Sequence, residues 1–415
     1  MLQVHNLTVK FLSGKVENEV VKKISFDLKE NKILGIVGES GSGKSVTSLA
    51  VLGLLPKNTI QEGDIFFDEK NLLKISDKEF QQIRGNKIAM IFQEPMSSLN
   101  PTLTCGSQVA EVLKQHTGLN KKEMYEEVIS LFQKVKLPLP DRIFNSYPHQ
   151  ISGGQKQRVM IAIAIACKPD LLIADEPTTA LDVTVQKEII LLLKELQKEN
   201  KMSILLISHD LSLVSEIADD VIILFKGQIV EKGNTTDIFH SPQHDYTKGL
   251  INSKPNLNQR LKKLPTVEDF IKNRIFTDIY SKKEREAYHS KIYGLKPLLE
   301  IVDVKKYFNT SDGFTKKPLI KAVDKVCFKL YEGETLGLVG ESGCGKTTLG
   351  RSIMQLEKVT SGKIFYKGKD ITHLSKTALQ NLRKEIQIIF QDPFSSLNPR
   401  ISIGNAILEP MNVHG

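Results

Sequence analysis

The sequence predicts an α/β fold, and it predicts that fold twice along the chain. The first observation is a buried-strand pattern at Ile33–Val37, followed by a glycine-rich loop and by an apolar segment of helix length. The second is the recurrence of this order, with an apolar segment at Thr335–Val339 before another glycine-rich loop. A strand, a glycine loop and a helix in this order bind phosphate, because the loop N–H groups and the helix N-terminus face an anion.

Both loops match the pattern Gly-x-x-x-x-Gly-Lys-[Ser/Thr], at residues 38–45 and 340–347. In the first, Lys44 would reach the β- and γ-phosphates of a nucleotide, and the Ser45 hydroxyl would hold Mg²⁺. Among chains of this length, roughly one in a hundred would contain one match by chance, and about one in ten thousand would contain two independent matches. We therefore reject chance and interpret both loops as nucleotide-binding.

Composition and length are typical of a globular protein with two or three domains. No apolar run is long enough to span a bilayer, and the first residues lack the pattern of a secretory signal, so we expect only peripheral membrane association. The cysteines lack Cys-x-x-Cys spacing, so we expect reduced thiols. They are Cys105, Cys167, Cys327 and Cys344.

The formal net charge is +9, and much of it lies in residues 253–297, where eleven Lys or Arg face five Asp or Glu. This concentration favours a basic linker over a nucleic-acid-binding domain face. A helix within the linker is predicted by apolar residues spaced for one face, and a membrane-surface role for that helix is the alternative. The apolar residues are Val267, Phe270, Ile271, Ile275 and Ile279.

The two copies can be aligned with each other. The alternating segment Leu2–Phe11, typical of an edge strand, recurs as Leu299–Phe308 at an offset of 297 residues.

We predict a complete first domain at 1–252, a partly helical linker at 253–297 and the N-terminal part of a second domain at 298–415. The second copy ends at the equivalent of about residue 117 of the first, so we expect it to lack the carboxylates and histidine described below.

A strand at Gly63–Asp68 belongs to a β-rich insert, and residues 104–145 predict two or three helices. Between them, the strand Ile88–Phe92 runs into the loop Gln93–Pro101, which recurs as Gln391–Pro399. Because a closely repeated loop implies a shared binding task, we predict that Met96–Pro101 docks a transmembrane partner. A shared structural turn is the alternative.

Two further strands deliver polar residues at their carboxyl ends. Leu171–Asp175 is followed by Glu176, and these two carboxylates suit a Mg²⁺ ligand and a group that polarises water. The strand Ile204–Ile207 is followed by His209, at the ligand-binding edge expected of such a sheet. The segment Ile151–Gln155 precedes an apolar helix and predicts a second anion-binding helix start.

The order of these elements resembles the nucleotide-binding domains of ABC ATPases over residues 1 to about 250. It comprises the phosphate loop, the Gln93 loop, Ser152–Gln155, Asp175-Glu176, Ala180–Asp182 and His209. A finer resemblance, to the ATPase subunits of peptide/nickel importers, rests on residues 92–101, 147–158 and 241–250. The resemblance implies a P-loop NTPase fold with a mixed β-sheet core, a helical subdomain and an N-terminal antiparallel β subdomain, repeated in tandem.

By this resemblance Phe11 stacks on adenine, Gln93 senses Mg²⁺ and water, Glu176 is the catalytic base and His209 contacts the γ-phosphate. Ile151, Ser152, Gly153, Gly154 and Gln155 would clamp ATP bound to the opposite domain. The residues assigned to ATP are Phe11, Gly38, Glu39, Ser40, Gly41, Ser42, Gly43, Lys44, Ser45 and Val46, then Phe308, Gly340, Glu341, Ser342, Gly343, Cys344, Gly345, Lys346, Thr347 and Thr348. Those assigned to the metal are Ser45, Gln93, Asp175, Thr347 and Gln391.

The function implied by the resemblance is an ATP-hydrolysing subunit that energises an importer of di- or oligopeptides, or of a related small solute such as nickel. It would lie on the cytoplasmic face of the membrane with transmembrane permease subunits and an extracellular or periplasmic solute-binding protein. It would pair as a homodimer or with a homologous ATPase subunit. Two alternatives are a soluble tandem ATPase acting on ribosomes or nucleic acid, and a regulatory ATP binder without hydrolysis.

Overall fold

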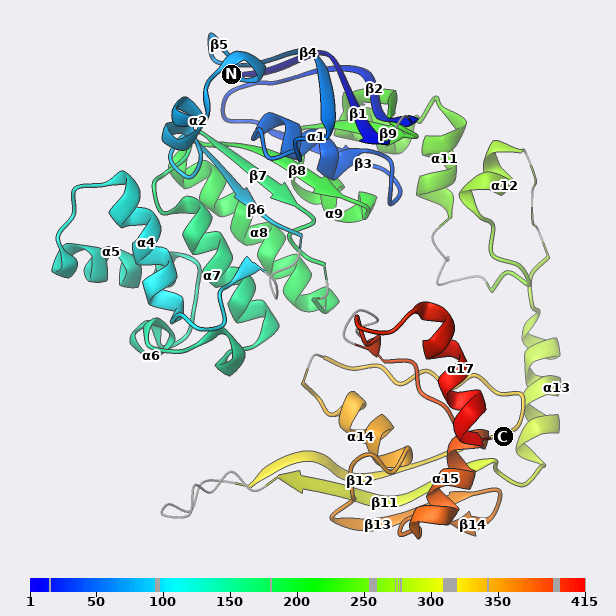
Figure 1. Ribbon diagram of the computed structural model, residues 1–415. Helices are drawn as coiled ribbons and strands as arrows, with labels where there is room; N and C mark the ends of the chain where they lie inside the picture. The colour runs from blue at the N-terminus through cyan, green and yellow to red at the C-terminus, as the bar shows by residue number, and fades with distance from the viewer. Residues whose placement is uncertain are drawn as a thin grey trace. The chain divides into compact units, whose positions relative to one another are not determined.

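The computed structural model describes residues 1–415 except 15, 94–97, 180, 254–259, 273, 275, 277, 309–318, 342, 391–395 and 415. The chain divides into two units, Met1–Ile279 and Tyr280–Gly415 (Figure 1). In the described residues no helix is both long enough and apolar enough to cross a bilayer.

The first unit begins with a four-stranded antiparallel sheet in the order β2-β1-β4-β5. Its strands are β1 (Leu2–Ser13), β2 (Val16–Leu28), β4 (Thr59–Phe67) and β5 (Lys70–Asn71). The prediction of β1 as an edge strand is wrong, because it pairs with β2 on one side and β4 on the other. Its alternating pattern reflects one buried face, which central strands of antiparallel sheets also have.

A six-stranded mixed sheet forms the centre of the first unit, in the order β10-β9-β3-β8-β7-β6. All neighbours from β9 to β6 are parallel, and only β10 runs antiparallel. Every residue of β3, β7 and β8 is buried, as expected for parallel strands covered on both faces. The strands are β3 (Ile33–Val37), β6 (Ile88–Ile91), β7 (Leu171–Asp175), β8 (Ser203–Ser208), β9 (Asp220–Phe225) and β10 (Gln228–Asn234).

Two core clusters cover the two faces of this sheet. One packs Ile33 and Val37 of β3 against the helices, and the other packs Leu34 and Ile36 against the antiparallel sheet. The helices α7, α8 and α9 lie on the first face, with α4 to α6 beyond them as a helical subdomain (Figure 1). The helices of the unit are α1 (Lys44–Val51), α2 (Asp77–Ile83), α4 (Cys105–His116), α5 (Lys121–Lys134), α6 (Pro140–Phe144), α7 (Gly153–Ile165), α8 (Val183–Asn200), α9 (Leu211–Ile217), α10 (Thr235–His240), α11 (Asp245–Asn252) and α12 (Val267–Ile271).

The helix predicted in the linker is shorter than its apolar spacing suggested. Helix α12 ends at Ile271, and Ile279 instead forms a β-bridge with Leu261. Ile275, also predicted for this helix, lies outside the described residues. Gly249 of α11 allows close packing on α12, because a Cβ there would lie 3.1 Å from the Phe270 Cβ.

The second unit repeats the antiparallel sheet, in the order β12-β11-β13-β14. Residues 335–339, expected as the strand before the second phosphate loop, are not in a strand, and Leu338 and Val339 are exposed. In the first unit β3 is held between β8 and β9, whereas residues 335–339 have no paired strand in the described part of the second unit. The elements are α13 (Lys282–Tyr293), β11 (Leu299–Phe308), β12 (Ile320–Leu330), α14 (Lys346–Ile353), β13 (Ser361–Tyr366), β14 (Lys369–Asp370), α15 (Lys376–Glu385) and α17 (Ile403–His414).

The two equivalent glycines before the loops give a matched test of this difference. A Cβ on Gly35 would lie 2.3 Å from the Val214 Cγ1, whereas a Cβ on Gly337 would meet nothing within 4 Å. We expect Gly35→Ala to destabilise the protein by about 1–3 kcal/mol through overpacking, and Gly337→Ala by less than about 0.5 kcal/mol. Scanning calorimetry of the two variants measures this. Equal loss of stability in both would contradict the difference in burial between the units.

Candidate active site

The loop at 38–45 joins β3 to α1 at the carboxyl edge of the central sheet. Gly43, the residue before the helix, has φ +101°, a left-handed conformation that glycine adopts without strain. A Cβ on Gly38 would lie 2.1 Å from the Leu224 carbonyl oxygen, so this position also accepts only glycine. The fold therefore requires glycine at positions 38 and 43, in addition to any requirement for backbone N–H groups to approach a phosphate.

The Lys44 ammonium is buried under this loop. Its Nζ donates to the carbonyl oxygens of Gly38 and Glu39, each at 2.8 Å, and the residue is only 4% exposed. Burial lowers the pKa of Lys44, and the charges of Glu176, Asp175 and Glu39 oppose that effect. A phosphate in the loop would offer this ammonium a better partner than two neutral carbonyls.

Ser42 supplies a second indication that the loop suits an anion. Among the described residues its Oγ is buried and has no hydrogen-bond partner. An unsatisfied buried hydroxyl costs free energy, and a phosphate oxygen would satisfy it.

Ser45 and Asp175 bring two oxygen atoms together beside the loop. The Ser45 Oγ donates to the Asp175 Oδ1 at 3.1 Å, across 130 residues of sequence. Burial raises the pKa of Asp175 to about 6, although the Ser45 hydrogen bond opposes the shift. In the described ranges no cluster of three His, Cys, Asp or Glu residues could hold a metal alone. This pair therefore suits a hard cation that takes its other ligands from phosphate and water.

Glu176 is the point at which the predicted catalytic residues meet. Its Oε2 accepts hydrogen bonds from Gln93 Nε2 at 3.2 Å and from Thr179 Oγ1 at 3.0 Å. The same oxygen lies 3.1 Å from His209 Nδ1. Gln93, Glu176 and His209 come from three different strand ends, so the parallel sheet assembles them.

The backbone of Glu176 is strained. Its φ is +46°, and Pro177 follows, so a left-handed conformation is disfavoured twice. The Glu176 N–H donates to the Ile207 carbonyl at 2.9 Å, and its carbonyl accepts the Thr179 N–H at 3.1 Å. Such conformations cost about 1–3 kcal/mol and are concentrated at functional sites.

Thr179 is a site residue that the sequence reasoning missed. Its position three residues after Glu176, with Pro177 between them, was the available signal, because a turn brings residues i and i+3 close together. No motif assigns a role to it, and only the folded turn shows its hydroxyl on the carboxylate.

The segment Ile151–Gln155 begins α7, as predicted. Ser152 Oγ accepts the Gln155 N–H at 3.3 Å, and Gln155 Oε1 accepts the Ser152 N–H at 3.0 Å. These bonds form a capping box at the helix start. Its assignment to ATP of an opposite domain stays a prediction.

The remaining first-copy residues lie near the loop or on β1. Phe11 of β1 and Val46 of α1 are half-buried and pack against the core cluster between the sheets. Glu39, Ser40 and Gly41 are exposed on the loop. Stacking of adenine on Phe11 stays a prediction.

The second loop reproduces the local geometry of the first. Gly345 has φ +100°, and Lys346 Nζ donates to the carbonyls of Gly340 and Glu341 at 2.6 and 2.7 Å. Lys346 is less buried than Lys44, and Thr347 is exposed. Gly343, Cys344 and Thr348 lie in or after this loop, and Phe308 ends β11, whereas Ser342 and Gln391 lie outside the described residues.

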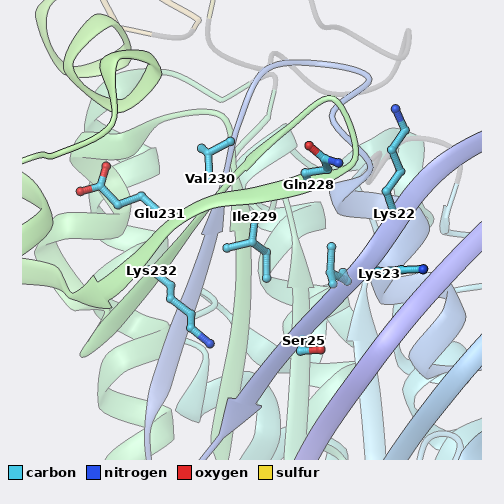
Figure 2. A pocket seen from close by; sticks show the side chains of 9 residues that line it. Lys22, Lys23, Ser25, Gln228, Ile229, Val230, Glu231 and Lys232 are labelled. Atoms are coloured by element: carbon cyan, nitrogen blue, oxygen red, sulfur yellow. The ribbon is translucent and has the colours of Figure 1, made fainter.

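A separate groove lies between β2 and β10 (Figure 2). Three lysines line it, Lys22 and Lys23 from β2 and Lys232 from β10. Figure 2 shows their ammonium groups pointing in different directions, so they do not converge on one anion. No residue of the 38–45 loop lines it, and we assign it no role in the candidate active site.

Two family profiles and many curated proteins match this chain. The profile of the family described as "ABC transporter" matches residues 21–179 and 323–412. The profile described as "Oligopeptide/dipeptide transporter, C-terminal region" matches residues 230–273. Similar curated proteins include the glutathione import ATP-binding protein GsiA of Escherichia coli (strain K12) and that of Shigella boydii serotype 4 (strain Sb227). Each is 42% identical over 428 residues, covering 100% of this chain and 68% of the relative.

Solved structures show the same fold. The dimeric post-hydrolysis state of the ATP-binding cassette MJ0796, bound to ADP and Pi, aligns with a TM-score of 0.52 and 29% identity. The alignment covers 57% of this chain and 99% of that one. CbiO1 from Clostridium perfringens, part of the transporter complex cbiONQ, aligns with a TM-score of 0.50 and 27% identity, covering 58% of this chain and 90% of that one.

We predict that Glu176→Gln keeps nucleotide binding and lowers the ATP hydrolysis rate by at least about a hundredfold, because Gln cannot accept a proton from water. Glu199→Gln is a matched control, since Glu199 forms an ion pair with Lys134 on the surface. A phosphate-release assay and a nucleotide titration measure the two effects. Hydrolysis by Glu176→Gln at the parental rate would place the base elsewhere, with His209 as the next residue to replace.

Proposed function

The chain belongs to the ABC transporter family and is an importer-type ATPase, and from this we propose that ATP hydrolysis at the loop of residues 38–45 drives uptake of a peptide or a related small solute. Support for the solute class comes from the oligopeptide/dipeptide transporter profile at residues 230–273 and from relatives named for glutathione import. These findings favour the importer over a tandem ATPase that acts on ribosomes or nucleic acid.

The observation that carries the proposal is the convergence on Glu176 beside the Lys44 loop. With ATP bound, the Lys44 ammonium would leave the carbonyl oxygens of Gly38 and Glu39 and contact the β- and γ-phosphates. Glu176 would hold and polarise the attacking water, and the hydrogen bonds from Gln93 and Thr179 would orient its carboxylate.

Mg²⁺ would bind at Ser45 and Asp175, together with phosphate oxygens and water, and Gln93 would complete the site. When bound, it supplies positive charge that stabilises the transferring phosphoryl group. Asp175 is a suitable ligand because its buried carboxylate is costly to keep charged without a cation. His209, which lies beside Glu176, would contact the γ-phosphate, and Phe11 would stack on adenine.

We propose that two nucleotide-binding domains associate, so that Ile151–Gln155 of one closes over ATP in the other. The partner domain comes from a second copy of this chain or from a homologous ATPase subunit. The MJ0796 cassette with ADP and Pi is itself a dimer. We keep 1–252, 253–297 and 298–415 as the proposed boundaries of the first domain, the linker and the second domain.

We propose that the membrane partner is a permease and that this chain binds it at the cytoplasmic face of the membrane. A solute-binding protein would bind the permease at the opposite face of the membrane. Docking by the predicted segment Met96–Pro101 stays a prediction, with one limit set by burial. Leu99 is 3% exposed and belongs to the core, so it does not contact a partner, and Met96 lies outside the described residues. The predicted segment included Leu99, but an apolar residue in a loop can also anchor that loop to the core.

Exposed apolar side chains on either side of this loop are better docking candidates. Phe92 is 42% exposed and Leu103 is 40% exposed. We predict that Phe92→Ser with Leu103→Ser uncouples the chain from a coexpressed permease while ATP binding is kept. Cofractionation with membranes, with and without the permease, measures docking.

Leu191→Ser is the matched control, because Leu191 is exposed to the same degree, 42%, but lies on α8. Membrane cofractionation of the double variant at the parental level would contradict the docking surface. Salt-sensitive sedimentation of the parent with ribosomes, and none with permease-containing membranes, would contradict the importer function itself.

A further inference from the structure

Tyr246 of α11 contacts the phosphate loop, although 207 residues separate it from Glu39. Its hydroxyl oxygen accepts the Glu39 backbone N–H at 3.0 Å. The Tyr246 side chain is fully buried, and its ring centroid lies 4.2 Å from that of Phe225 on β9. Tyr246 belongs to the segment that matches the oligopeptide/dipeptide transporter C-terminal region.

The position of Tyr246 is held by its own segment. The Glu231 carboxylate on β10 accepts the backbone N–H groups of Gln243 at 2.8 Å and His244 at 3.1 Å. His244 Nδ1 accepts the Tyr246 N–H at 3.1 Å and so caps α11. These bonds give the Ser241–Leu250 motif a structural task, which is to place the Tyr246 hydroxyl at the loop.

The Glu39 backbone is hydrogen-bonded through both of its polar groups. Its N–H is bound by Tyr246, and its carbonyl is bound by the Lys44 ammonium. If Lys44 turned to a bound phosphate, the Glu39 carbonyl would lose this partner, whereas the hydrogen bond from the Glu39 N–H to Tyr246 would not depend on Lys44. Burial raises the pKa of Tyr246 to about 12, so the phenol stays neutral at physiological pH.

We propose that Tyr246 is a positioning residue for nucleotide binding: its hydroxyl fixes the Glu39 peptide and so keeps the loop of residues 38–45 in its phosphate-binding shape. The segment 230–273 is thereby part of the ATP site and is not only an appendage to the domain. This inference rests on the proposed role of the 38–45 loop as the ATP site.

The test is Tyr246→Phe in the full chain, because this change removes one oxygen and keeps the ring on Phe225. The loop would bind the phosphates of ATP equally in the ground state and in the transition state. A less ordered loop should therefore weaken binding in both states to the same extent, which raises KM and leaves kcat unchanged. We expect KM for ATP to rise by about three- to thirtyfold, the range set by one lost hydrogen bond and one unsatisfied N–H, with kcat within about twofold of the parent. Hydrogen exchange should become faster at the amides of residues 39–45 and stay unchanged elsewhere.

Tyr125→Phe is the matched control, because its hydroxyl donates to Asp141 Oδ1 at 2.6 Å in the helical subdomain. We expect KM to be unchanged in this variant. Glu231→Ala is a second route to the same state, since it releases Gln243 and His244 without altering Tyr246, and it should raise KM in the same direction.

A lower thermal midpoint in Tyr246→Phe with parental KM and loop exchange would show a purely structural role and overturn the proposal. If Tyr246→Phe fails to fold, parental KM in Glu231→Ala overturns it in the same way. A parent protein that does not bind ATP would contradict the proposed function, not this inference alone.

Discussion

The parallel pairing of β3, β8 and β7 is the constraint on which the rest of the site depends. Val37 pairs with Ser208, and Asp175 pairs with Ile207, so the three strands end at the same edge of the sheet. Because both faces of these strands are buried, a change of register would move polar strand-end groups into the core. The pairing therefore brings together the cationic loop, the adjacent carboxylates of Asp175 and Glu176, and His209, although these three groups lie far apart in the sequence.

Comparison with the second unit distinguishes features of the site that depend on the loop sequence from features that depend on neighbouring strands. Lys346 binds the carbonyls of its own loop as Lys44 does, so the glycine pattern alone produces the loop conformation. In the described residues the segment 335–339 before that loop is not in a strand, and its Leu338 and Val339 are exposed. Thr347 is also exposed, whereas Ser45 contacts Asp175. Burial of the ammonium and the approach of a carboxylate thus require the neighbouring strands.

The sequence predicted what depends on short-range pattern. The loop, the helix cap at Ser152 and the strand ends at Asp175 and His209 all follow from spacing within a few residues. Contacts that depend on the folded chain were missed or wrong: Thr179 on Glu176, the burial of Leu99 and the Tyr246 bond to Glu39. Each of these contacts involves a loop residue and a partner that only a turn or the tertiary fold brings close. Apolar periodicity carries no information about such pairs.

We predict that the loop of residues 38–45, whose strand β3 is paired with β8 and β9, carries catalysis. Lys44→Ala and Lys346→Ala, compared in one ATP hydrolysis assay on the full chain, test it most directly. Charge-assisted hydrogen bonds contribute about 1.5–3 kcal/mol each, so Lys44→Ala should weaken ATP binding by at least about tenfold and remove most hydrolysis. Lys346→Ala should keep most of the parental rate. Loss of hydrolysis in Lys346→Ala together with retention in Lys44→Ala would contradict the account.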